Sequence, residues 1–117
     1  MNQKPFIIKR NDTLPDLQIN VKTRSCINAI IPFDLTNVTG CTFSMVDECG
    51  SVVIASNPAQ VVNPTAGTVQ YSWIDGDTGV SGKYQGEFEL FFDDGKKISV
   101  PSLGGIEIFI DQDINNL

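Results

Sequence analysis

The sequence predicts an all-β fold, a single antiparallel β-sandwich of seven or eight strands. Apolar and polar residues alternate with a period close to two along most of the chain, the pattern of a sheet with one face on a core and the other in water. Clusters of Asn, Asp, Gly, Ser and Pro interrupt the alternation about every ten residues, a spacing typical of sandwiches and barrels. No window of useful length carries the i, i+3, i+4, i+7 apolar pattern of a helix.

Eight segments carry the strand pattern. We expect strands near residues 5–10, 16–23, 40–47, 51–56, 67–74, 84–92, 96–100 and 105–111. Pro5 stands where the first strand begins, a position at which no backbone N–H is needed. The next strands are defined by apolar residues at every second position: Leu17, Ile19 and Val21, then Cys41, Phe43 and Met45. Gly50 can adopt the positive φ of a tight turn before the fourth strand. The segment 56–64 carries no assignment.

The second half of the chain has the same alternation. Its apolar positions are Val69, Tyr71 and Trp73, then Tyr84, Phe88, Leu90 and Phe92, and finally Ile106, Ile108 and Ile110. Asp94-Gly95 separates the strand at 84–92 from the one at 96–100, and Asp-Gly is a strong signal of a tight hairpin. These eight strands account for the predicted sandwich.

Length and charge limit the classes of protein. The 117 residues predict one domain over 1–117, in which 111–117 forms a flexible or docking tail. The net charge of −6 argues against nucleic-acid binding, which uses a basic surface. No apolar run reaches the roughly 20 residues that span a bilayer, so we expect no membrane contact. The residues 1–5 lack a signal-peptide layout, which indicates synthesis in a cytosol.

Catalytic and metal-binding patterns are scarce. The chain has no histidine, so no Ser-His or Cys-His pair is possible and a zinc site would need an unusual ligand set. Cys26, Cys41 and Cys49 are expected as free thiols or small buried residues, although a Cys41–Cys49 bridge across a hairpin stays open. We expect no enzyme and no cofactor.

The loop at 75–79, Asp-Gly-Asp-Thr-Gly, offers the candidate metal ligands. Asp75 and Asp77 stand two residues apart, as the carboxylates of many calcium loops do. The third position is Gly79 and the flanks are strands rather than helices. The pattern therefore favours a connection in which Asp side chains stabilise turns.

The aromatic residues predict a core and a candidate interface. Four residues on the inward parity are expected in the core: Trp73, Tyr84, Phe88 and Leu90. Phe91 and Phe109 stand on the opposite parity. They would be exposed interface residues if their strands have one wet face, or covered residues if both faces are packed.

Five segments together resemble a known family. They are residues 10–15 (RNDTLP), 69–73 (VQYSW), 77–90 (from DTG to GKYQGEFEL), 92–95 (FDDG) and 100–101 (VP). Their order and spacing resemble the immunoglobulin-like domain at the amino end of phage baseplate upper proteins and related tailed-phage virion proteins. The family's glycine in the first motif is Asn11 here, and family members often continue beyond the point where this chain stops.

The resemblance implies an immunoglobulin-like sandwich and a non-enzymatic structural role in the virion, at the tail, baseplate or neck. It implies contacts with other virion proteins, in several copies or as a homo-oligomer. A capsid decoration protein of the phage head is one alternative. A carbohydrate- or receptor-binding module is the other, with Asp75, Asp77, Asp93 and Asp94 as its candidate residues.

Overall fold

The structure, a computed structural model, describes residues 5–101 and 104–112 as strands and connections without a helix. The strands are β1 (Phe6–Lys9), β2 (Leu17–Asn20), β3 (Lys22–Arg24), β4 (Ile30–Pro32), β5 (Val38–Asp47), β6 (Val52–Pro58), β7 (Gln60–Asn63), β8 (Thr68–Tyr71), β9 (Gly82–Phe92), β10 (Lys97–Val100) and β11 (Ile106–Asp111). The predicted all-β class is confirmed. Within these residues, no helix is long and apolar enough to cross a membrane.

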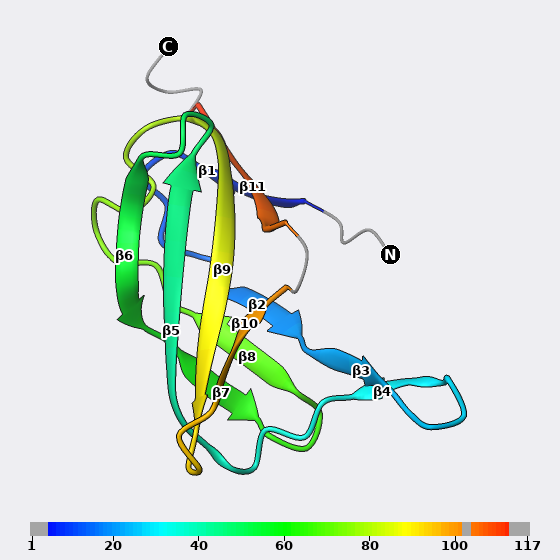
Figure 1. Ribbon diagram of the computed structural model, residues 1–117. Coiled ribbons are helices and arrows are strands. Elements are labelled where there is room, and N and C mark those ends of the chain that lie inside the picture. Colours follow the sequence, from blue (N-terminus) through cyan, green and yellow to red (C-terminus); the bar gives the residue numbers. More distant parts are fainter. Residues whose placement is uncertain (1–4, 102–103, 113–117) are drawn as a thin grey trace.

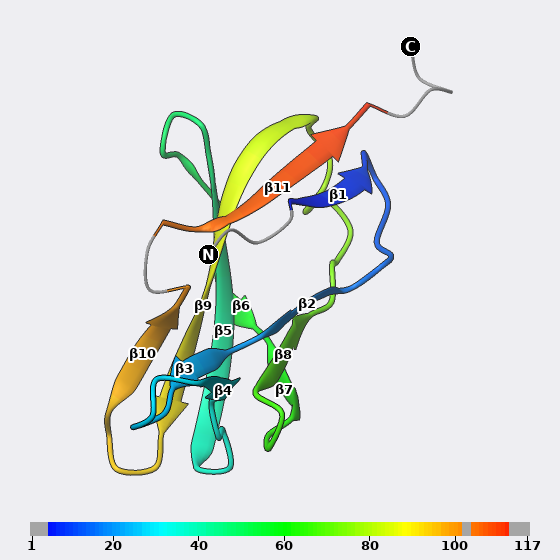
Figure 2. The ribbon, with the colours of Figure 1, turned by 90° about the vertical axis from the view of Figure 1, so that its right-hand side faces the viewer.

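Two sheets enclose the core in a sandwich-like arrangement (Figure 1). The large sheet has the order β1-β11-β9-β5-β6, and β10 pairs with the same edge of β9 as β11 does. The small sheet has the order β2-β8-β7. Strands β3 and β4 form a separate two-stranded sheet that extends away from the other two in Figure 1 and points towards the viewer in Figure 2.

The core is built from the inward residues of both sheets, as their alternation predicts. Phe43 of β5 and Phe88 of β9 are fully buried, and the Phe43 ring stacks on Tyr71 of β8 with the ring centres 4.6 Å apart. A methyl group at Gly86 would lie 2.7 Å from the Phe43 ring. Gly86 is therefore the gap in β9 that admits this ring between the sheets.

The connection from β8 to β9 crosses between the two sheets and is fixed by two aromatic side chains. The Tyr84 hydroxyl donates a 2.6 Å hydrogen bond to the carbonyl of Val80, and the Trp73 indole N–H donates a 3.1 Å bond to the carbonyl of Pro15. Both side chains are buried. Each therefore satisfies its polar atom on the backbone while its ring fills the core.

Two predictions about the sheets were wrong. The sandwich is not purely antiparallel, because β1 pairs with β11 in parallel, with Phe6 opposite Ile108. Eleven strands form in the described residues where seven or eight were expected. The expected strand at 16–23 divides into β2 and β3 at Val21, and β4 and β7 were not expected at all.

Candidate functional site

The loop at 75–79, which holds the weak candidate metal ligands Asp75 and Asp77, is bonded to the protein core through Asp77. One carboxylate oxygen of Asp77 accepts hydrogen bonds from the Tyr71 hydroxyl at 2.6 Å and from the backbone N–H of Ile74 at 3.0 Å. Burial, and then the Asp77 carboxylate, raise the pKa of Tyr71 to about 12. Asn57 donates a further 3.1 Å bond to the same hydroxyl. Asp77 thus has a structural contact, while Asp75 is exposed.

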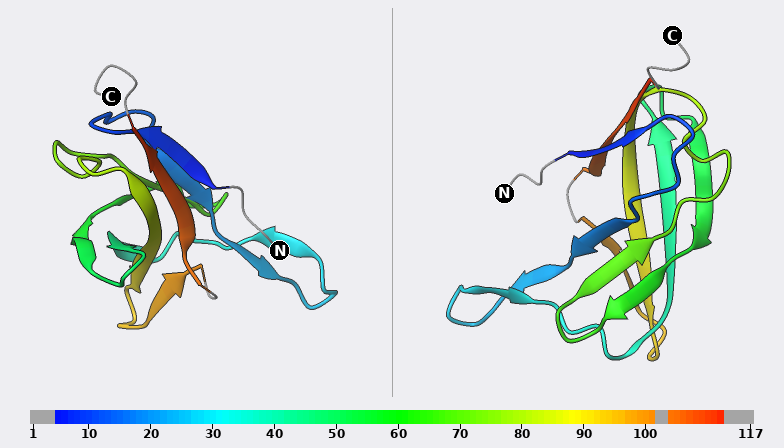
Figure 3. Two further views of the ribbon diagram at one scale, coloured as in Figure 1. Left: turned by 90° about the horizontal axis from the view of Figure 1, so that it is seen from above. Right: turned by 180° about the vertical axis from the view of Figure 1, so that it is seen from behind.

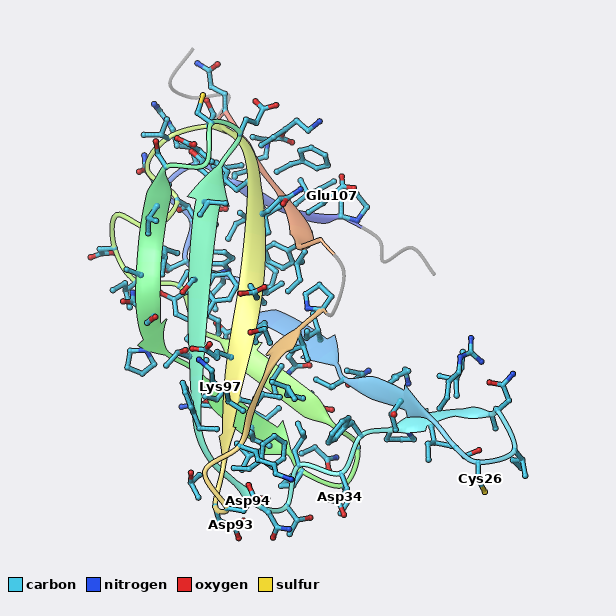
Figure 4. All side chains as sticks on the ribbon, in the orientation of Figure 1. Cys26, Asp34, Asp93, Asp94, Lys97 and Glu107 are labelled. Atoms are coloured by element: carbon cyan, nitrogen blue, oxygen red, sulfur yellow. The ribbon has the colours of Figure 1, made fainter. Side chains whose placement is uncertain are left out.

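The four acidic candidates do not come together. Asp75 and Asp77 precede β9, whereas Asp93 and Asp94 follow it at the lower end of the molecule (Figure 4). An eleven-residue strand separates the two pairs by roughly 30 Å. No group of three or more His, Cys, Asp or Glu side chains that could hold a metal occurs within residues 5–101 and 104–112.

The two interface candidates, Phe91 and Phe109, lie on the outer face of the large sheet, and both are half-buried. The Lys83 ammonium lies 5.7 Å from the centre of the Phe109 ring. Phe91 lies beside Gly40, where an added methyl group would be 3.7 Å from the ring. Neighbouring residues of the same face therefore cover part of each ring, so neither ring is a freely exposed anchor.

Phe109 forms part of a hollow of about 470 Å³ on this face. The hollow has an apolar part, Val46 and Phe109, and four charged side chains: Asp47, Glu48, Lys83 and Glu107. It lies where β5 ends and β9 begins, beside the turn that joins β5 to β6. The Asp47 carboxylate orders this turn by accepting the backbone N–H groups of Cys49 and Ser51, both at 2.9 Å.

A second surface was not expected from the sequence. Residues 22–32, which we call the arm, are β3, a turn and β4, and they project beyond both sheets (Figure 3). Every residue of β3 and β4 is exposed. Ile27 at the turn is 82% exposed and Ile30 is 50% exposed. An isolated two-stranded hairpin is at best marginally stable in water.

The tip of the arm is ordered by its own hydrogen bonds. The N–H of Ser25 donates to Ala29 O and that of Asn28 donates to Ser25 O, both at 2.8 Å. Asn28 has a φ of +66°, as the last residue of this hairpin loop requires. The Arg24 guanidinium donates to the Asn28 carbonyl at 3.2 Å. These bonds order the backbone of the tip and the Arg24 side chain, and Ile27 is exposed between them.

The base of the arm is anchored in the sandwich. Val21 is buried, its N–H donates to Gly67 O at 2.7 Å, and its carbonyl accepts the N–H of Phe33 at 2.9 Å. The ring of Phe33 packs beside the ring of Phe92, with the ring centres 6.2 Å apart. A methyl group at Gly67 would lie 2.5 Å from the Val21 oxygen, so glycine permits this close contact. The arm thus leaves the body in a defined direction.

All three cysteines are free. Burial raises the pKa of the Cys41 thiol to about 11. Cys26 is exposed at the tip of the arm, and Cys49 is exposed in the turn beside the hollow. The bridge between Cys41 and Cys49, which the sequence left open as an alternative to free thiols, is not formed.

No protein-family model and no curated protein matches the chain. Among solved structures, the chain is similar to CopC from Methylosinus trichosporium OB3b, with a TM-score of 0.52 and 12% sequence identity. The match covers 94% of this chain and 86% of CopC. At this identity the similarity concerns the fold alone.

Proposed function

We propose that this chain is an immunoglobulin-like structural module that acts by protein–protein contact. The arm carries this proposal, because it is an ordered, exposed and partly apolar element that packs on neither sheet. A hairpin with two wet faces gains little stability within its own chain. Contact with a partner would bury its isoleucine side chains and account for its presence.

The strand order supports the immunoglobulin-like assignment. In that topology, the later strands G and F pair with C and C′ in one sheet, and B, E and D form the other. The orders β11-β9-β5-β6 and β2-β8-β7 correspond to this arrangement. The bond from the Tyr84 hydroxyl to Val80 is the tyrosine corner of such folds. Phe43 fills the space at Gly86, where antibody domains carry an intersheet disulfide.

We place the module in a tailed-phage virion, at the tail, baseplate or neck. The resemblance of the five sequence segments, in their order and spacing, to virion domains is what supports this setting. A rigid block with a projecting arm suits repeated contacts in a particle, where each contact can be weak because symmetry repeats it.

Purified particles of the source phage test the proposal. Quantitative mass spectrometry is expected to find the chain in several copies per particle, and immunogold electron microscopy is expected to label the tail. Labelling over the head would favour the capsid decoration protein instead. Absence of the chain from washed particles would reject both virion roles.

The receptor-binding alternative has a separate test. Calcium-dependent glycan binding that is lost in the double variant Asp75→Ala/Asp77→Ala would support it. The internal hydrogen bonds of Asp77 and the separation of the two acidic pairs along β9 give this alternative no assembled site.

A further inference from the structure

We infer that the arm of one copy docks in the hollow of a second copy of this chain. The inference rests on the proposed assembly function and names the partner. Residues 33–37 join the arm to the start of β5, whereas the hollow is lined by Val46 and Asp47 at the end of the same strand. The ten residues of β5 separate the two surfaces by roughly 30 Å (Figures 1 and 4). The arm therefore cannot fill the hollow of its own chain.

The charges of the two surfaces are complementary. The arm contains Lys22 and Arg24 and no acidic residue, whereas the whole chain has a net charge of −6. The remainder of the chain therefore carries −8. The hollow has three carboxylates and one ammonium, and neither Glu48 nor Glu107 forms an ion pair within the described part of the chain. A second copy thus offers the basic arm an acidic receiving surface.

The apolar groups of the two surfaces also correspond. Arg24 and Ile30 are cross-strand partners and share one face of the arm. Ile27 projects at the tip. The hollow places Val46 and the Phe109 ring beside the carboxylates. Docking would bury isoleucine on this apolar part while the Arg24 guanidinium binds a carboxylate, for which its planar donors are well suited. The fixed tip limits the entropy lost on docking.

The native thiols provide a direct test. Cys26 lies at the arm tip and Cys49 lies next to Glu48 at the hollow, so docking brings together these thiols of two copies. The full chain is treated with diamide, a thiol oxidant, and the products are separated without reductant and mapped by peptide mass spectrometry. We expect Cys26–Cys49 links between copies, and their loss in both Cys26→Ser and Cys49→Ser. Links only between identical cysteines, or no links, would overturn the inference.

Charge exchange gives a second test, in which the yield of the same link reports on the charge contact between the arm and the hollow. Arg24→Glu and Glu107→Arg are each expected to lower the yield of the Cys26–Cys49 link about tenfold, the loss that follows from about 1.4 kcal/mol of contact energy. A mixture of the two variants is expected to recover the link, because the new carboxylate on the arm of one variant can pair with the new guanidinium in the hollow of the other. Lys96→Glu makes the same charge change as Arg24→Glu at an exposed position outside both surfaces and serves as its control.

Circular dichroism of each variant checks that it is folded. We expect parent-like spectra, because the Arg24 and Glu107 side chains both lie on the surface. Parent-like yields in both single variants, or no recovery in their mixture, would contradict the docking geometry. The particle experiment is independent of this result. A chain present in particles without a Cys26–Cys49 link after oxidation would reject the self-docking inference and leave the virion role intact.

Discussion

At the scale of single residues, the Asp77 carboxylate shows how a motif typical of ion loops can stabilise a fold. It binds the hydroxyl of buried Tyr71 and the N–H of Ile74, and so joins the loop to the small sheet. A buried hydroxyl donor without an acceptor costs free energy, which explains an acidic residue at this position. Asp75, two residues earlier, is exposed and does not bind the Tyr71 hydroxyl.

Asp77→Ala is therefore expected to lower the free energy of unfolding by about 1–3 kcal/mol, because it leaves the Tyr71 hydroxyl without its acceptor. Asp75→Ala, an exposed position in the same loop, is the matched control and should stay within about 0.5 kcal/mol of the parent. Urea denaturation measures both. Equal effects of the two substitutions would show that the hydrogen bond to Tyr71 contributes little.

The same hydroxyl predicts a pH dependence at high pH. The pKa of Tyr71 is raised to about 12 in the folded protein and is about 10 in an unfolded chain. Between these values the unfolded chain binds fewer protons, so stability is full below pH 10 and falls as the pH rises towards 12. The Cys41 thiol adds a decline between its ordinary value of 9.0 and about 11.

Tyr71→Phe should therefore flatten the decline of stability above pH 11, where the contribution of Cys41 is largely complete. Urea denaturation at a series of pH values from 9 to 12 compares the variant with the parent. The same slope in both proteins above pH 11 would contradict the assignment to Tyr71.

At the scale of elements, the arm differs from the strands of the two main sheets because every residue of β3 and β4 is exposed. Even β7, at the edge of the small sheet, has one half-buried residue. Its residues make turn and ladder hydrogen bonds with one another, and the contacts with the body begin at Val21 and Phe33. The arm should therefore be dispensable for folding.

Replacing residues 24–30 by Asn-Gly tests this expectation, since that dipeptide closes a tight hairpin between Thr23 and Ile31. We expect a free energy of unfolding within about 1 kcal/mol of the parent, because the removed side chains contribute little to the core. Gly67→Ala is the contrasting variant and should destabilise clearly, since its methyl group would collide with the backbone at the base of the arm. Unfolding of the shortened chain under native conditions would contradict the assignment of the arm as a surface element.

The sequence predicted the strands that have one buried face. Alternation placed β5, β8, β9 and β11, because a core face selects apolar residues at every second position. The arm lacks a core face, so Ile30 and Ile31 follow one another without alternation and β4 was missed. The signals that could have found the arm are the run without acidic residues at 17–33 and the turn residue Asn28.

Other features depend on contacts between distant parts of the chain. The parallel pairing of β1 with β11 joins residues about a hundred positions apart, and no local pattern records it. The hollow likewise combines side chains of β5, β9 and β11. The alternation of the sequence predicted that Phe109 lies on the outer face. The partial coverage of its ring by Lys83 depends on the pairing of β9 with β11, which the sequence does not record.

At the scale of the whole molecule, the arm makes the protein longer than a compact chain of its size. The principal extents are 51 × 26 × 25 Å and the radius of gyration is 15.0 Å, compared with about 13 Å for a compact domain of about 100 residues. The elongated shape places acidic and basic surfaces far apart on one molecule.

Small-angle X-ray scattering should detect this shape. The chain shortened at 24–30 is expected to have a lower radius of gyration than the parent at concentrations where both are monomers. Equal values would indicate that the arm folds back onto the sandwich in solution. A rise with concentration in the parent alone would agree with self-docking through the arm.

The placement of arm and hollow at opposite ends of β5 also gives any chain of docked copies a direction. One terminal subunit would keep an empty hollow and the other a free arm, so the two ends would recruit different neighbours. Such an assembly could grow from a platform that supplies one hollow and stop at a protein that fills the last one. Its length would then be set by these two end partners, while the repeating subunits stay identical.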